Sequence, residues 1–80
     1  MTYRERLQSW VWEALDQLGG RGTIADVAKR IWLNHEADLQ GAGDHFYSWQ
    51  YDMRWAAQQL RKKGKIDFRK SGKLNEWFIK

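Results

Sequence analysis

The sequence predicts a mostly helical α+β domain, in which three helices are followed by a small antiparallel hairpin of two or three strands. Apolar residues recur at steps of three and four in three stretches before Gly64, which is the period of an α-helix. After Gly64 the period changes to two, which is the period of a strand, and a short turn interrupts it. A helix followed at once by a basic hairpin is the organisation of a winged helix-turn-helix, here spanning residues 1–80 as a single domain.

The first two helices are predicted over residues 3–18 and from residue 24 to about residue 35. The Gly-rich run at residues 19–22 ends the first helix. Thr23 and Asp26 have the spacing of a capping box, in which a hydroxyl and a carboxylate each accept a backbone N–H at the start of a helix.

The connection between the second and third helices is predicted to be long. It runs from residue 36 to residue 47, with Gly41-Ala42-Gly43 breaking the helix and Leu39 and Phe46 anchoring the segment. Because a minimal helix-turn-helix has a turn of only three or four residues, we expect its tight form to be absent.

The third helix is predicted to start near Tyr47 or Ser48, with Ser48 or Asp44 as its N-cap. It ends where Gly64 follows three cations, since glycine adopts the left-handed cap and cations favour the carbonyl end of a helix. Four apolar residues on one face are predicted to point into the core: Trp49, Met53, Ala56 and Leu60.

The hairpin, or wing, is predicted from two short alternating runs. Ile66 and Phe68 alternate with charged residues, and residues 77–79 close the chain with the same period. Residues 70–73 are turn material with cations at the tip. Residues 22–23 can add a one- or two-residue third strand.

The charge is concentrated in the second half of the chain. Residues 1–40 hold five Lys/Arg and six Asp/Glu, whereas residues 41–80 hold nine and four, so the net charges are −1 and +5 and sum to +4. A basic excess on the half that carries the third helix and wing is typical of a phosphate-binding surface. Double-stranded DNA is therefore the expected partner.

In this architecture the third helix lies in the major groove, and the residues opposite its buried face contact DNA. Gln50 and Arg54 are the preferred candidates for base edges, because Gln pairs with adenine and Arg with guanine. The full set of predicted contacts on this helix is Tyr47, Gln50, Tyr51, Arg54, Gln58 and Arg61.

The wing adds three cations that are predicted to contact the phosphate backbone: Arg69, Lys70 and Lys73. Lys29 and Arg30 on the second helix are further candidates for phosphate contacts. Any one of these cations can equally be an ordinary solvated charge.

Six tryptophans in so small a domain need separate explanations. Trp49 and Trp77 are expected in the core, and Trp55 at the base of the wing. The other three cannot all be fully buried, so they are expected at the rim of the core or, alternatively, in a partner surface or a base-stacking site: Trp10, Trp12 and Trp32.

Composition excludes several other classes. The chain has no cysteine, no apolar run long enough to span a membrane and no signal-like leader, so we expect a cytoplasmic location. The imidazoles and carboxylates between His35 and His45 match no known metal spacing, and no catalytic set is recognisable. We therefore expect no enzyme activity, no cofactor and no metal.

A family resemblance also favours a DNA-binding function, and it covers the C-terminal third of the chain. A Trp-Ala pair, a Leu four positions after the Ala, a Gly that ends the helix and a closing Trp-x-aliphatic strand stand here as Trp55-Ala56, Leu60, Gly64 and Trp77-Phe78-Ile79. This pattern resembles the N-terminal winged-helix domain of Mrr-type restriction proteins. The resemblance implies a DNA-binding module of a restriction or defence system, in which a nuclease domain follows. Leu74-Asn75-Glu76 replaces the family's Gly before the closing strand.

Two other functions remain open. A winged helix can serve protein–protein contact, here through the tryptophans of the first helix and Trp32. The mixed charge of the third helix, with Asp52 beside Arg54, keeps this alternative open. The chain can also be an accessory domain that forms a homodimer or associates with a separate or fused nuclease domain.

Overall fold

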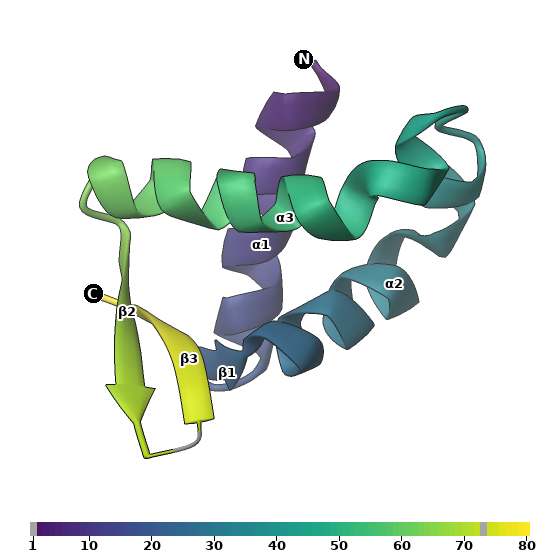
Figure 1. Ribbon diagram of the computed structural model, residues 1–80. Coiled ribbons are helices and arrows are strands. Elements are labelled where there is room, and N and C mark those ends of the chain that lie inside the picture. The colour runs from purple at the N-terminus through teal and green to yellow at the C-terminus, as the bar shows by residue number, and fades with distance from the viewer. Residues whose placement is uncertain (1, 73) are drawn as a thin grey trace.

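The computed structural model describes residues 2–72 and 74–80 and confirms the predicted fold class, with three helices and a three-stranded antiparallel sheet (Figure 1). The strands are ordered β1-β3-β2, so the chain's first strand pairs with its last. In chain order the elements are α1 (Tyr3–Gln17), β1 (Arg21–Thr23), α2 (Ile24–Gln40), α3 (His45–Lys62), β2 (Ile66–Ser71) and β3 (Leu74–Ile79).

The core lies where α3 crosses α1, with α2 and the sheet closing its sides (Figure 1). Fourteen apolar residues are buried there, and each fully buried large side chain contributes about 1.5–3 kcal/mol relative to exposure. The predicted inward face of α3 is confirmed, because all four of its residues are at most 5% exposed: Trp49, Met53, Ala56 and Leu60. Among the described residues, no helix is both long enough and apolar enough to cross a membrane.

The predicted helix boundaries at Thr23 and Gly64 are confirmed. The Thr23 hydroxyl accepts the N–H of Asp26 at 3.1 Å, and the Asp26 carboxylate accepts the N–H of Thr23 at 3.3 Å, which completes the capping box. At the end of α3, Gly64 has φ +76°, and the N–H of Lys65 donates to the carbonyl of Leu60 at 3.0 Å. This Schellman turn leads α3 directly into β2.

The second helix was predicted to end at about residue 35, and its helical geometry does break there, since His35 has non-helical backbone angles (φ −136°, ψ 28°). A further helical segment, which was not predicted, continues α2 beyond this kink to Gln40. Its ring stacks on Trp10 at 4.2 Å, and its Nε2 lies 3.2 Å from a Glu13 carboxylate oxygen. Contacts with α1 therefore hold the kink. Only residues 41–44 remain between α2 and α3, so the expectation of a long connection was wrong, and the turn has the length of a tight helix-turn-helix.

The third helix also starts earlier than predicted, at His45 rather than at Tyr47 or Ser48. Asp44 occupies the N-cap position but makes no side-chain capping bond. Ser48 lies inside the helix, where its hydroxyl donates to Asp52 at 3.0 Å, so it is not the cap.

The sheet contains the predicted third strand, one residue longer than expected. Gly22 of β1 pairs with Trp77 of β3, and a Cβ at Gly22 would lie 2.9 Å from the side chain of Leu18. Glycine therefore lets β1 approach the end of α1 closely. In the wing, β2 and β3 are paired from Ile66 opposite Ile79 to Ser71 opposite Leu74, which makes both strands longer than predicted.

Candidate nucleic-acid interface

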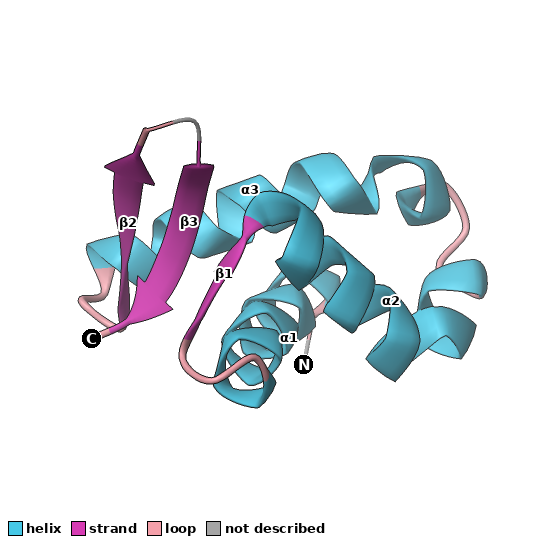
Figure 2. Cartoon of the chain, turned by 90° about the horizontal axis from the view of Figure 1, so that it is seen from below, coloured by secondary structure: helices cyan, strands magenta, loops and turns pink. Residues whose placement is uncertain are grey.

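The outward face of α3 carries every side chain that the sequence predicted there. The six are all exposed: Tyr47, Gln50, Tyr51, Arg54, Gln58 and Arg61. The two tyrosines are almost fully open, at 87% exposure for Tyr47 and 78% for Tyr51. The wing projects its tip toward the side of the molecule on which α3 lies, whereas α1 lies on the opposite side (Figure 2). The helix α3 and the far end of the wing thus lie on the same side of the molecule in this view.

Asp52, the acidic residue expected beside Arg54, is turned away from this face. Its carboxylate accepts a hydrogen bond from the Tyr3 hydroxyl at 3.0 Å and another from Ser48 at 3.0 Å. Burial, and then the hydrogen bond and negative charge of Asp52, raise the pKa of Tyr3 well above its usual value. Within the described part of the chain, no carboxylate lies within 4.0 Å of the Arg54 guanidinium. Arg54 is therefore available to an external anion.

Arg61, at the C-terminal end of the outward face of α3, interacts with other residues of the chain. Its Nε lies 3.6 Å from the Asp67 carboxylate, and its guanidinium lies over the ring of Phe68 at 5.5 Å. Both partners belong to β2, so Arg61 ties α3 to the wing. It remains close to half exposed and can still offer a hydrogen bond to a phosphate.

The two described cations of the wing differ in their surroundings. Arg69 lies directly opposite Glu76, with a 2.8 Å ion pair, and over the ring of Phe78 at 5.5 Å. Lys70 is exposed and, since side chains alternate along a strand, shares the opposite face of β2 with Phe68. Lys70 is thus the more available of the two cations. The third predicted cation, Lys73, lies outside the described residues.

A groove of about 870 Å³ between α2 and the start of α3 was not predicted from the sequence. Trp32 stacks on Trp49 with ring centroids 6.2 Å apart, and Leu33 is 70% exposed beside them. Tyr47 and Gln50 line the same groove, as does Lys29 of α2. Leu33 was the available signal, because it is an apolar residue outside the helical stripe of α2.

The six tryptophans do not form one surface, although Trp32 stacks on Trp49. Trp49 and Trp77 are 5% exposed, which confirms them as core residues. Trp55 lies under the guanidinium of Arg4 from α1 at 4.8 Å. Of the three surplus tryptophans, Trp10 stacks on His35, Trp32 lines the α2–α3 groove, and Trp12 lines a different hollow beside the end of α3.

The described residues contain no group of three or more His, Cys, Asp or Glu side chains arranged to hold a metal ion. Comparison with known proteins adds no relative, since no family model, no curated protein and no solved structure matches the chain. The case for a function therefore depends on the geometry of the chain itself.

Proposed function

We propose that this chain is a winged-helix module that binds double-stranded DNA, with α3 in the major groove and the wing on the phosphate backbone. The observation that carries the proposal is the position of Arg54. It is exposed at the middle of the outward face of α3, and no carboxylate of the described residues lies within 4.0 Å of it.

The side chains on this face suit distinct parts of a duplex. Gln50 and Arg54 stand one helical turn apart, and amide and guanidinium groups pair with base edges in the major groove. Lys29 of α2 lines the groove beside Gln50, and Lys70 lies on β2 of the wing; both are exposed cations of the kind that contact phosphates. The basic excess of residues 41–80 favours the approach of a polyanion.

Fluorescence anisotropy with a labelled random-sequence duplex at low and at high salt tests the proposal. We expect Arg54→Ala/Lys70→Ala to weaken binding about tenfold or more and to reduce the salt slope by about two. The matched control, Arg6→Ala/Arg21→Ala, removes the same charge from α1 and β1 and should keep most of the affinity. Equal losses in both double variants, or no binding by the folded wild type at low salt, would overturn the proposal.

The α2–α3 groove favours a second candidate function, which is binding of a protein partner. Leu33 and Tyr47 are exposed apolar groups beside Trp32, and such patches are typical of interaction sites. Under this alternative, Leu33→Gln abolishes binding of the protein partner and leaves binding of a duplex unchanged. Binding of the protein partner should depend little on salt concentration.

The resemblance to Mrr-type N-terminal domains extends the first proposal. On its basis we propose that the module acts in a cytoplasmic restriction or defence system, as a homodimer or with a fused or associated nuclease domain. Sedimentation of the chain alone and with a duplex distinguishes monomer from dimer.

A further inference from the structure

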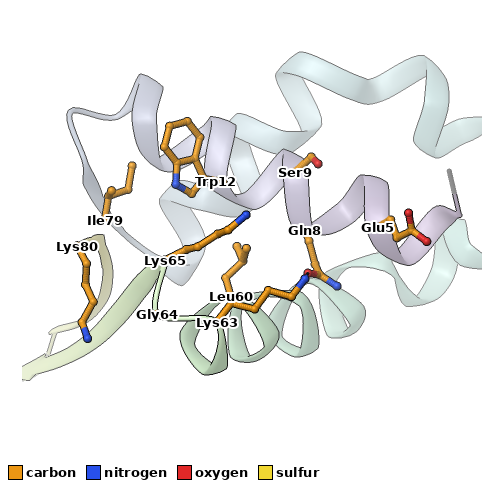
Figure 3. A pocket seen from close by; sticks show the side chains of 10 residues that line it. All are labelled: Glu5, Gln8, Ser9, Trp12, Leu60, Lys63, Gly64, Lys65, Ile79 and Lys80. Carbon is orange, nitrogen blue, oxygen red and sulfur yellow. The ribbon is translucent and has the colours of Figure 1, made fainter.

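A second hollow, of about 710 Å³, lies at the base of the wing, where the end of α3 and the end of β3 meet α1 (Figure 3). Its volume falls within the range of about 300–1,000 Å³ that is usual for ligand clefts. Lys65 and Lys80, at the start and end of the wing's two strands, line it, so the hollow lies at the opposite end of the wing from the tip.

The hollow has a basic rim. Lys63, Lys65 and Lys80 line it, although the Nζ of Lys80 lies 3.9 Å from the Asp67 carboxylate of β2. Glu5 is the single carboxylate among the described side chains that line the hollow, and it lies away from Lys65 (Figure 3). The Nζ of Lys63 donates to the neutral amide oxygen of Gln8 at 2.7 Å, so its charge stays uncompensated there. Lys65 extends across the opening toward α1 (Figure 3). The site therefore favours a ligand with negative charge.

The floor of the hollow is apolar. The indole of Trp12 is 38% exposed and stands beside the stem of Lys65 (Figure 3). Leu60 and Ile79 continue this surface beneath it. An aromatic ring with a polar N–H beside a basic rim is the composition that binds a ligand with both an apolar and an acidic group.

We propose that this hollow binds an acidic segment of a partner protein. The carboxylates of this acidic segment pair with Lys63 and Lys65, and an apolar side chain of the same segment packs on Trp12. A duplex fits the hollow less well, because phosphates on a convex rod reach the lysines but leave the concave apolar floor empty. The site lies apart from the outward face of α3, so it does not depend on DNA binding and leaves that face open.

The test uses a fluorescein-labelled peptide of sequence Asp-Glu-Asp-Leu-Phe-Glu-Asp-Glu and the whole 80-residue chain. We expect Lys65→Gln to weaken peptide binding about fivefold, as loss of one favourable charge pair does. The matched control Lys70→Gln removes the same charge from the far end of the wing and should leave peptide affinity unchanged. Both lysines are exposed, so both variants are expected to fold, which thermal melting checks.

A ¹H–¹⁵N spectrum locates the peptide. The indole N–H signal of Trp12, identified by its loss in Trp12→Phe, should shift as the peptide is added. A peptide in which Ser replaces Leu and Phe should bind more weakly, because the apolar contact is lost. The proposal is overturned if no peptide binds at millimolar concentration, or if Lys65→Gln binds as wild type does. It is also overturned if Lys65→Gln weakens duplex binding as much as Lys70→Gln, since DNA would then occupy the site.

Discussion

The hydroxyl of Tyr3, at the start of α1, donates a hydrogen bond to the carboxylate of Asp52 in α3 across 49 positions of sequence. The ring of Tyr3 also stacks on His45 at 3.9 Å, so one side chain fixes the first two turns of α3 against α1. Asp52 lies three residues after the buried Trp49 and four before the buried Ala56, so the helix directs it away from the outward face, and the bond to Tyr3 keeps its carboxylate there. The surface that we propose meets DNA therefore carries no charge from Asp52.

This bond predicts a specific loss of stability in alkaline solution. Burial and Asp52 raise the pKa of Tyr3 above its unfolded value near 10, so above that pH the folded state binds more protons than the unfolded state. The free energy of unfolding should therefore be undiminished below about pH 10 and should fall as pH rises further. Denaturant titrations at several pH values measure it.

Tyr3→Phe should lower the free energy of unfolding by about 1 kcal/mol at neutral pH, because it removes one hydrogen bond, and should flatten the alkaline decline. Tyr51→Phe, at an exposed site on α3, is the matched control, and its free energy of unfolding should still fall above about pH 10 as in the wild type. An identical alkaline slope in wild type and Tyr3→Phe would contradict the role of Tyr3.

The wing predicts unequal effects for two adjacent cations. Arg69 is already paired with Glu76 at 2.8 Å, whereas Lys70 is exposed on the other face of β2. Lys70→Ala should therefore weaken duplex binding more than Arg69→Ala, by about two- to fivefold in anisotropy titrations. A larger loss for Arg69→Ala would show that the ion pair opens on binding and that the opposite face of the wing meets the backbone.

The Schellman turn predicts a strong preference for glycine at one position. Gly64 has φ +76°, a conformation that costs about 1–2 kcal/mol for a residue with a Cβ. Gly64→Ala should lower the free energy of unfolding by that amount, measured by urea titration. Gly41→Ala is the control, because Gly41 ends α2 with φ −86° and should change stability little. Equal effects of the two substitutions would show that strain at Gly64 is not the cause.

The fold was predictable wherever a local signal exists. The stripe from Trp49 to Leu60, the capping box at Thr23 and the glycine at residue 64 each act within one or two turns of helix, and all three were confirmed. The predicted end of the second helix at residue 35 coincides with the kink, whereas the helical segment beyond it was missed. The contacts of His35 with Trp10 and Glu13 join residues more than twenty positions apart and have no local signal in the sequence.

The residues of the candidate site could be predicted from the sequence, but the contacts that its charged side chains make within the molecule could not. The outward side of α3 follows from its buried side, so exposure at Arg54 could be inferred from the sequence. The pairing of Arg69 with Glu76 depends on the register of the wing, and the bond of Tyr3 to Asp52 joins residues 49 positions apart. Neither contact has a local sign in the sequence, and both engage charges that would otherwise be free to face a ligand.

The most direct test of the central claim is a ¹H–¹⁵N titration of the isotope-labelled chain with an unlabelled random-sequence duplex. DNA binding as proposed predicts that the largest chemical-shift changes occur at backbone amides of α3 from Tyr47 to Arg61 and of β2 near Lys70. The amide signals of α1 from Leu7 to Leu15 should not shift. Changes centred on α1, or a spectrum unchanged by the duplex at low salt, would contradict the proposed DNA-binding function.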